Sequence, residues 1–310
     1  MAGKNKAKKK GRLRVHRVVD VPLREVSGIC LRRGRGRMAL VAIGDRVAMV
    51  AWAAVQHGHR GSIDWRTIDI ARLSGSRLPV DDPQIEAVCA DGAGRLLLLQ
   101  EAPPRAELVD LAARRVAASV ELAVEGRDEL ARSWSNPKGS RGEGAVLLPG
   151  GHLLVAKEKS PAALIEFGPP GSRSRGLIRG GALAAGARWR VPNGTYSYVA
   201  RAVWRPDKAL TKACADFSDL EIGPDGRLYL LSDKSAVIAR IDDLPAGGGT
   251  ARLSAAWCLE DLEGKPEGLA FTPTGHAIIA LDTRKARNNL VLVKPAIARA
   301  RDYTARARAR

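Results

Sequence analysis

Pairs of polar side chains, most of them carboxylates, recur along this 310-residue chain at a fixed spacing. The four regular pairs, each 15 positions apart, are Glu86 and Glu101, Glu143 and Glu158, Ser218 and Asp233, and Glu267 and Asp282. A fifth pair, Ser27 and Asp45, is three residues longer. Both Ser members have an acid two positions earlier, Glu25 and Asp216, which would share a face with the Ser in an extended strand. Each copy therefore supplies a carboxylate near its first position and another at its second.

Carboxylates that lie close together cannot all stay ionised without a partner. One set of partners is the basic side chains that flank the second-position acids: Arg46, Arg105, Lys157, Lys159, Lys234, Arg284 and Lys285. The other is a hard divalent cation, because Ca²⁺ takes six to eight oxygen ligands in flexible geometry and an all-oxygen set suits Ca²⁺ or Mg²⁺. For such a cation we select Glu25, Glu86, Glu143, Asp216 and Glu267 as candidate ligands. If the site is hydrolytic, Glu143 or Glu158 is the candidate general base.

The residues between the two members of each pair indicate a β-hairpin. A Gly follows the first member by eight positions in the regular copies, as Gly94, Gly151, Gly226 and Gly275, and by nine as Gly36 in the first copy. The turns are rich in Gly, Pro and Asp, which provide the backbone angles that hairpin turns need. The second strands are continuously apolar, which is typical of strands covered on both faces.

Two further strand-like runs follow the hairpins, and four strands per unit of about 40–60 residues are typical of a propeller blade. We therefore expect an all-β fold, a five-bladed β-propeller of four-stranded blades. The 75 residues between Glu143 and Ser218 leave a sixth blade open as an alternative. Residues 15–21 have no blade of their own, and we expect them to form the missing outer strand of the last blade, which would close the ring. The expected domains are a basic tail (1–14), the propeller (15–296) and an Arg-rich tail (297–310).

In such a fold the members of each pair should lie nearly opposite one another on the two innermost strands of a blade, around one end of the central channel. There the acids would bind a metal or ligand, or accept hydrogen bonds from the backbone of the next blade and lock the ring. Both uses can coexist, with first-strand acids facing the channel and second-strand acids bracing the blades. We expect segments 125–141 and 168–215 to cover this mouth, with Arg141 and Lys157 near it as basic groups suited to an anionic ligand.

The net charge of +18 lies mainly at the two ends of the chain. Residues 1–37 contain 13 Lys and Arg and two acids, and residues 284–310 contain nine and one. Such arms favour solubility with weak, non-specific polyanion binding, or serve as a tether to nucleic acid or an anionic membrane. The sequence shows no hydrophobic signal core or membrane span, so we expect a cytoplasmic monomer. The four cysteines are scattered without zinc-ligand spacing and are expected to be buried apolar fillers.

Short strings around the first-position residues resemble the SdiA-regulated (YjiK-like) propellers and the related phytase-like, esterase-like propellers. They are Glu25-Val-Ser-Gly-Ile29, Gly142-Glu-Gly-Ala-Val146, Asp216-Phe-Ser-Asp-Leu220 and Pro266-Glu-Gly-Leu-Ala270. The resemblance covers about residues 19–295 and implies a β-propeller that binds Ca²⁺, with no firmly assigned reaction. It would give metal-type roles to Glu86, Glu143 and Glu267. Two positions depart from the pattern, since Ala87 and Asp219 stand where the family has Gly.

Three functions remain open on the sequence. The first is a Ca²⁺-type cation-binding propeller that binds, and in an enzymatic version hydrolyses, an anionic ester such as a phosphoester. The second is a non-catalytic platform for a protein or ligand, in which the acids are structural. The third is a polyanion-associated protein in which the basic arms matter most.

Overall fold

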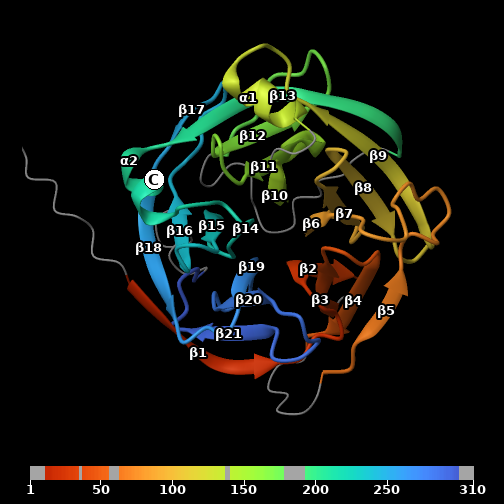
Figure 1. Cartoon of the computed structure of the whole chain (residues 1–310), viewed down its shortest axis with the longest axis vertical. Coiled ribbons are helices and arrows are strands. Elements are labelled where there is room, and N and C mark those ends of the chain that lie inside the picture. The colour runs from red at the N-terminus through yellow and green to blue at the C-terminus, as the bar shows by residue number, and fades with distance from the viewer. Residues whose placement is uncertain (1–10, 35–36, 56–62, 137–139, 178–192, 300–310) are drawn as a thin grey trace, which may run out of the picture.

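The chain folds into strands arranged as blades around a central axis (Figure 1). The computed structural model describes residues 11–34, 37–55, 63–136, 140–177 and 193–299. Its described strands form five four-stranded antiparallel groups, and the innermost strand of each group contacts the innermost strands of both neighbouring groups. The expected all-β propeller is thereby confirmed, with five blades in the described part of the chain.

The strands of each blade run from the channel outward. Blade 1 comprises β2 (Val26–Gly34), β3 (Arg37–Gly44), β4 (Met49–Ala54) and β5 (Arg66–Asp69). Blade 2 comprises β6 (Ile85–Ala90), β7 (Leu96–Gln100), β8 (Arg105–Asp110) and β9 (Arg115–Ala123). Blade 3 comprises β10 (Gly142–Leu147), β11 (Leu153–Lys157), β12 (Ala163–Gly168) and β13 (Gly194–Pro206). Blade 4 comprises β14 (Asp219–Ile222), β15 (Leu228–Ser232), β16 (Val237–Ile241) and β18 (Leu253–Glu260). Blade 5 comprises β19 (Lys265–Phe271), β20 (Ala277–Asp282), β21 (Leu290–Lys294) and β1 (Gly11–Val19).

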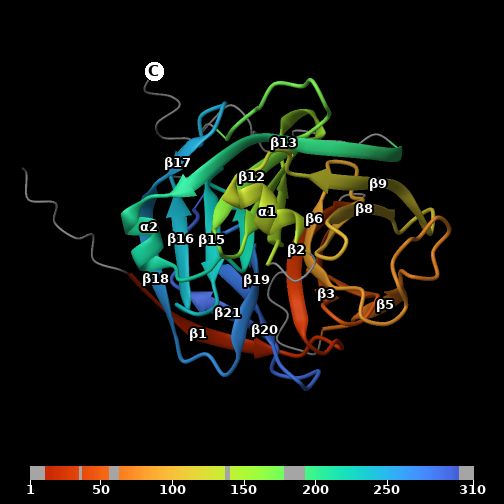
Figure 2. The same cartoon turned by 45° about the horizontal axis from the view of Figure 1, so that its top comes forward.

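The N-terminal strand closes the ring, as the sequence predicts. β1 pairs antiparallel with β21, with Val15 opposite Val293, so the first strand of the chain completes the last blade. Figure 2 shows β1, in red, along the outside of the blue C-terminal strands. β1 begins at Gly11, four residues before the expected start of the propeller. Residues 1–10 and 300–310, which hold most of both expected tails, lie outside the described residues.

The remaining elements are short. The described part of segment 168–215, where a sixth blade stayed open, contains β13 and the helix α2 (Lys208–Ala213). The helix α1 (Glu129–Ser135) lies in the other long segment. A 3-10 turn (Pro149–Gly151) joins β10 to β11, and β17 (Gly249–Ala251) adds to the outer edge of β13.

The outermost strands also pair between blades. β9 of blade 2 runs parallel to β13 of blade 3, and β18 of blade 4 runs parallel to β1 of blade 5. The four strands of blade 1 form a sheet of their own, which a single β-bridge between Ser74 and Arg115 joins to blade 2. The ring is therefore held by these two strand ladders, by the short pairing of β17, which lies between β16 and β18 of blade 4, with β13 of blade 3, and by packing elsewhere.

Five apolar clusters fill the spaces between adjacent blades. Leu97 and Ile165 belong to the cluster between blades 2 and 3, and Trp204 and Leu230 to that between blades 3 and 4. All five residues of β7, of β11 and of β15 are buried, which confirms the two-sided covering expected of the second strands. Cys30, Cys89 and Cys214 are buried free thiols, and Cys258 is partly exposed. Among the described residues, no helix is long and apolar enough to cross a membrane.

Candidate functional site at the channel mouth

The first-position residue of four repeats sits in a β-bulge of the innermost strand. The strand register shifts across Ser27 in β2, Glu86 in β6, Glu143 in β10 and Glu267 in β19. A bulge adds one unpaired residue to a strand and re-aims its side chain. In these four strands, the recurring polar side chain therefore does not follow the regular alternation of side chains between the two faces of the sheet.

In the four repeats that have a bulge, the two members of the pair are offset by two positions rather than nearly opposite, which corrects the expected geometry. The N–H of Glu101 donates to the carbonyl of Gln84, and the N–H of Glu158 donates to that of Arg141, in each case two residues before the first member of the pair. In blade 2 the bulge shifts the pairing of the two strands by one residue. The turn shifts it by one more, because Ala90 pairs with Leu96, which centres the hairpin on residue 93 and not midway between Glu86 and Glu101.

The Gly that follows the first-position residue allows the inner strands of neighbouring blades to approach closely. A Cβ on Gly144 would lie 2.5 Å from the backbone nitrogen of Leu220 in the next blade. On Gly268 it would lie 3.0 Å from the nitrogen of Ile29. The Glu-Gly pattern thus combines a channel-end carboxylate with a close contact between blades.

Asp219, which departs from this pattern, is a brace between blades 4 and 5. Its buried carboxylate accepts hydrogen bonds from the N–H of Leu220 at 2.7 Å and from the N–H of Leu269 at 2.6 Å. Burial raises the pKa of this carboxyl well above its ordinary range, and these two hydrogen bonds oppose that rise. The locking role considered for the acids is therefore real at this position.

The first-strand acids of blades 2, 3 and 5 affect one another electrostatically. Burial raises the pKa of Glu86 well above its ordinary value, and the charges of Glu143, Asp45 and other acids raise it further. Burial likewise raises the pKa of Glu143, with Glu101 and Glu158 adding to the effect. Burial raises the pKa of Glu267 to about 8, with added contributions from Asp233 and Asp282. Carboxyls from three blades therefore act on one another at this end of the channel, and Lys159 and Lys265 offset part of their effect.

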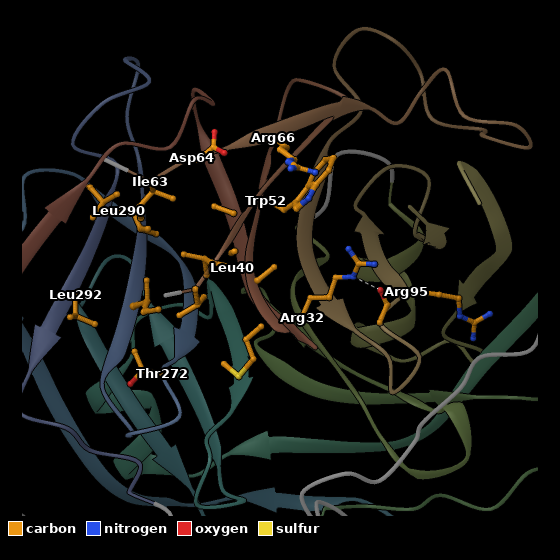
Figure 3. A pocket seen from close by; sticks show the side chains of 18 of the residues that line it. Arg32, Leu40, Trp52, Ile63, Asp64, Arg66, Arg95, Thr272, Leu290 and Leu292 are labelled. Carbon is orange, nitrogen blue, oxygen red and sulfur yellow. Dashed lines mark hydrogen bonds between the residues drawn. The ribbon is translucent and has the colours of Figure 1, made fainter. Parts of the chain in front are cut away.

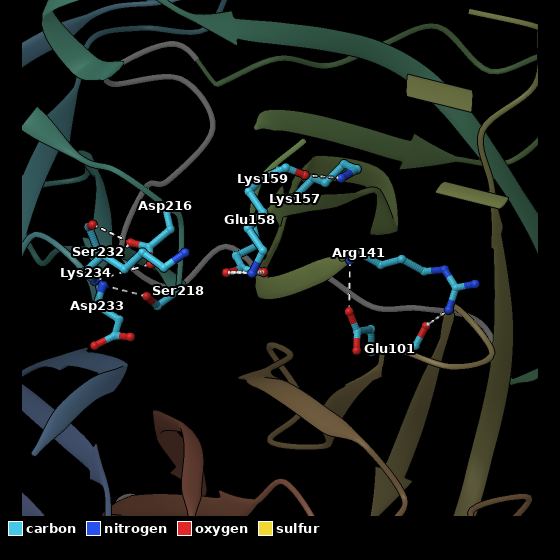
Figure 4. A network of polar contacts seen from close by, with 10 residues as sticks. All are labelled: Glu101, Arg141, Lys157, Glu158, Lys159, Asp216, Ser218, Ser232, Asp233 and Lys234. Atoms are coloured by element: carbon cyan, nitrogen blue, oxygen red, sulfur yellow. Dashed lines mark hydrogen bonds and ion pairs between the residues drawn. The ribbon is translucent and has the colours of Figure 1, made fainter. Parts of the chain in front are cut away.

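The second-strand acids have their own partners (Figure 4). Glu101 accepts a hydrogen bond from the N–H of Arg141 at 3.0 Å, across the boundary between blades 2 and 3. Glu158 pairs with Lys159, and Asp282 has Lys265 at 4.0 Å. Asp45 lies 3.6 Å from Arg46 and shares a hydrogen bond with the carboxyl of Glu86. Of the predicted cationic partners, Arg46 and Lys159 form ion pairs here.

Among the described residues, two other predicted cationic partners, Arg105 and Lys234, form no ion pair with a second-strand acid. Arg105 pairs with Glu107 at 2.7 Å inside blade 2 rather than with the mouth. Burial raises the pKa of Asp233, and Asp216 raises it further, while Lys265 and Lys234 lower it. Lys265, which precedes the first-position Glu by two residues, is a mouth cation that the sequence reasoning missed.

The Ser-type repeats use their polar groups within the backbone framework. Ser27 Oγ donates to the carbonyl of Ile85 at 2.6 Å, joining blades 1 and 2. Ser218 Oγ accepts from the N–H of Asp233 at 2.7 Å. Asp216, selected as a metal ligand, is buried and accepts from Ser232 Oγ at 2.5 Å and from the N–H of Lys234 at 3.2 Å. Its Oδ1 oxygen is thus engaged inside blade 4.

Glu25, also selected as a ligand, lies at the entry to blade 1. Its backbone has φ of 49°, its N–H donates to the carbonyl of Thr283 of blade 5, and its carboxylate lies 3.9 Å from the Arg46 guanidinium. Within the described part of the chain, no three carboxylate, imidazole or thiol side chains are grouped closely enough to hold a metal ion. The donor chemistry suits a hard cation, but the Ca²⁺ site expected from the sequence is not preformed.

Arg141 and Lys157, selected as basic groups for an anionic ligand, are committed to the protein backbone. The buried Arg141 guanidinium donates to the carbonyls of Glu101 at 2.9 Å, Trp134 at 2.7 Å and Asn136 at 2.9 Å. It fixes the end of helix α1 against blade 2. Lys157 is fully buried and donates to the carbonyl of Lys159, and burial lowers its pKa to about 8. Residues 137–139 and 178–192 of the expected cover lie outside the described residues.

Glu221 is a second residue that the sequence reasoning missed. It lies two positions after Asp219 in β14, and burial raises its pKa to about 8. It also raises the pKa of the buried thiols Cys30 and Cys89, which places it near them in the inner strands. The signal available in the sequence was its spacing, since residues two apart in a strand share a face.

The fold and the mouth together define a β-propeller with an acidic channel end. The sequence matches no protein-family model and no curated protein. It is similar in structure to virginiamycin B lyase from Staphylococcus aureus, with 10% identity and a TM-score of 0.38 over 88% of this chain and 72% of that one. It is also similar to a streptogramin B lyase (11%, 0.43, 89% and 95%) and to a gluconolactonase from Xanthomonas campestris (12%, 0.43, 94% and 88%). The fold assignment rests on the strand pairings and not on these similarities.

Proposed function

We propose that the channel mouth binds a divalent cation of the Ca²⁺ or Mg²⁺ type, and that the protein uses this site to bind and hydrolyse an anionic ester. The observation that carries the proposal is the convergence of Glu86, Glu143 and Glu267 from three blades, with each pKa raised by burial and by neighbouring acids. Among the described residues, no ion pair joins any of these three carboxyls to a basic side chain.

A divalent cation would relieve this repulsion. It would favour the charged form of each carboxyl, which burial and the neighbouring acids now disfavour. Oxygen ligands in flexible geometry suit Ca²⁺ in particular. Since the three side chains are not grouped as a coordination shell, cation binding would have to draw them together.

The residues around the mouth suit the chemistry of ester hydrolysis. A cation bound here would polarise the ester and lower the pKa of a coordinated water. Glu143 is the proton acceptor that we favour. Burial and neighbouring acids raise its pKa in the absence of a cation, and a bound cation would favour the charged form that can accept a proton. Lys159 would supply positive charge to an anionic substrate group by exchanging its present partner, Glu158, for that group. The resemblance of the short sequence strings to SdiA-regulated and phytase-like propellers implies the same direction, but no family model matches the sequence.

An alternative function is a non-catalytic platform in which the acids only hold the ring together. Four contacts favour it: those of Ser27 with Ile85, Glu101 with Arg141, Asp216 with Ser232, and Asp219 with Leu269. They account for one second-strand acid, Glu101, and for Asp216 and Asp219 of blade 4. They leave Glu86, Glu143 and Glu267 without a structural role.

The test is a thermal melt of EDTA-treated protein against added Ca²⁺ and Mg²⁺. A ligand at a hundred times its Kd stabilises the folded state by about 2.7 kcal/mol, which raises Tm by several degrees. Glu143→Gln should abolish the rise, whereas Glu129→Gln, an exposed acid on helix α1, should keep it. Hydrolysis of p-nitrophenyl phosphate should then depend on the same cation. A melt that neither ion moves would favour the platform.

A further inference from the structure

A cavity of about 1100 Å³ lies at the end of the blades opposite the acidic mouth. Its walls include the inner-hairpin turn residues Gly94 and Thr272, whereas the acids lie where the inner hairpins begin and end. It extends around blade 1 toward blades 2 and 5 (Figure 3). It is thus separate from the site proposed above.

The pairing within blade 1 shows why a hollow forms on the face toward blade 2. One cross-strand row runs Cys30, Val41, Trp52 and Arg66, and residues directly opposite in a sheet share a face. The next row runs Arg32, Ala39 and Ala54. The two alanines leave space that the larger side chains around them enclose. The hollow therefore has Trp52 on one side and a guanidinium at each end.

Each of the two guanidinium groups at this hollow has N–H groups that make no hydrogen bond with the described residues. Arg32 uses its Nε to reach the carbonyl of Gly94 in blade 2, which holds it across the blade boundary. Arg66 is exposed beside Trp52, and it makes no ion pair or hydrogen bond with the described residues. The planar fork of an Arg side chain matches a carboxylate or phosphate group.

The neighbouring charges leave the hollow positive. Arg95 is neutralised by Asp91, with nitrogen–oxygen distances of 2.8 and 2.7 Å. Asp110 accepts from the N–H groups of Ala112 and Ala113 and caps its own turn. Asp64 is exposed at the outer rim. The part of the cavity over the alanines thus offers an indole face and two Arg groups.

We propose that this hollow binds a small aromatic anion. The ring of the ligand would pack on Trp52 over Ala39 and Ala54, and its carboxylate or phosphate would bind the Arg66 guanidinium beside Trp52. Arg32 would add positive charge at the other end of the hollow. Aromatic packing and charge-assisted hydrogen bonds would both be needed, since either alone is weak at a partly exposed site.

The probes are 1-naphthoate and its neutral counterpart 1-naphthamide, titrated by calorimetry into the full-length, EDTA-treated protein. Without divalent cations, the result does not depend on the acidic mouth. We expect 1-naphthoate to bind at least tenfold more tightly than 1-naphthamide. Arg66→Gln and Trp52→Leu should each weaken 1-naphthoate binding by tenfold or more.

The matched control is Arg72→Gln, which removes an exposed Arg that pairs with Asp69 at 2.9 Å outside the hollow. It should leave the affinity unchanged. Arg66 is exposed, so its variant should fold normally, and circular dichroism checks this. Equal affinity for the two probes, no binding of 1-naphthoate, or unchanged binding in folded Arg66→Gln would each overturn the proposal.

Discussion

The carboxylate of Asp219 in β14 accepts a hydrogen bond from the backbone N–H of Leu269 in β19, with 2.6 Å between oxygen and nitrogen. This buried contact joins the innermost strands of blades 4 and 5 at a position where three of the other four repeats have Gly. A side chain thus supplies there what close backbone approach supplies between blades 3 and 4.

Replacing Asp219 should therefore destabilise the ring. In Asp219→Ala the N–H of Leu269 loses its acceptor in a buried position, and an unsatisfied buried donor costs about 1–3 kcal/mol. Urea unfolding should show the loss. Asp242→Ala, an exposed acid of the same blade, should change stability by less than about 0.5 kcal/mol. Equal effects of the two substitutions would mean that the contact contributes nothing.

Close approach between blades predicts a graded response to added methyl groups. A Cβ on Gly144 would lie 2.5 Å from a backbone nitrogen of blade 4, whereas one on Gly28 would meet Val88 of blade 2 at 3.2 Å. Gly144→Ala should cost about 1–3 kcal/mol from overpacking, and Gly28→Ala should cost less. Chemical denaturation of both variants checks the order. A larger loss for Gly28→Ala would contradict it.

The raised pKa of Glu267 predicts a pH-dependent gain on removing its charge. Its pKa is about 8 in the folded protein, above the ordinary 4.5, so the folded state binds more protons than the unfolded state between these values. Stability falls as pH rises through this window. In EDTA, Glu267→Gln should therefore raise Tm at pH 8.5 and leave it nearly unchanged at pH 4.

The control for this prediction is Glu263→Gln, an exposed acid four residues earlier. It should show no such pH dependence. A Glu267→Gln variant that melts below the wild type at pH 8.5 would mean that the carboxylate is stabilised by contacts that the structure does not show.

The ring-closing strand β1 should contribute as much to the stability of the folded protein as a strand in the core. Leu13 in β1 is fully buried, so Leu13→Ala should cost about 2–5 kcal/mol, as cavity-forming substitutions do. Val18 in the same strand is 46% exposed, and Val18→Ala should have little effect. Thermal melts compare the two. A similar small shift for both would show that the strand is dispensable for stability.

Much of this fold could be predicted because repeat spacing and apolar runs are sequence properties. The spacing between paired acids predicted the hairpins. The strand at residues 15–21, which has no blade of its own, predicted that the ring is closed by the N-terminal strand, and the pairing of β1 with β21 confirms this. The bulges at Glu86 and Glu143 could not be predicted, since they depend on how neighbouring blades pack.

The roles of individual side chains at the mouth were also hidden. The sequence predicts Arg141 as a basic side chain that binds an anionic ligand, but its guanidinium N–H groups donate to three backbone carbonyls. Glu221 showed no pairing partner in the repeat, and its position became clear only from the inner strands of other blades. Contacts between segments far apart in the chain decide such roles, and spacing within one repeat does not contain them.

The separate sheet of blade 1 has a consequence for local unfolding. Blades 2 and 3, and likewise blades 4 and 5, cannot part without breaking a parallel ladder between their outer strands. Blade 1 is tied to blade 2 along its edge by the single bridge of Ser74 with Arg115. The free energy of local opening should therefore be lowest on the two sides of blade 1. The cavity with Trp52 and Arg66 lies there, where transient separation would admit a ligand at least cost to the rest of the ring.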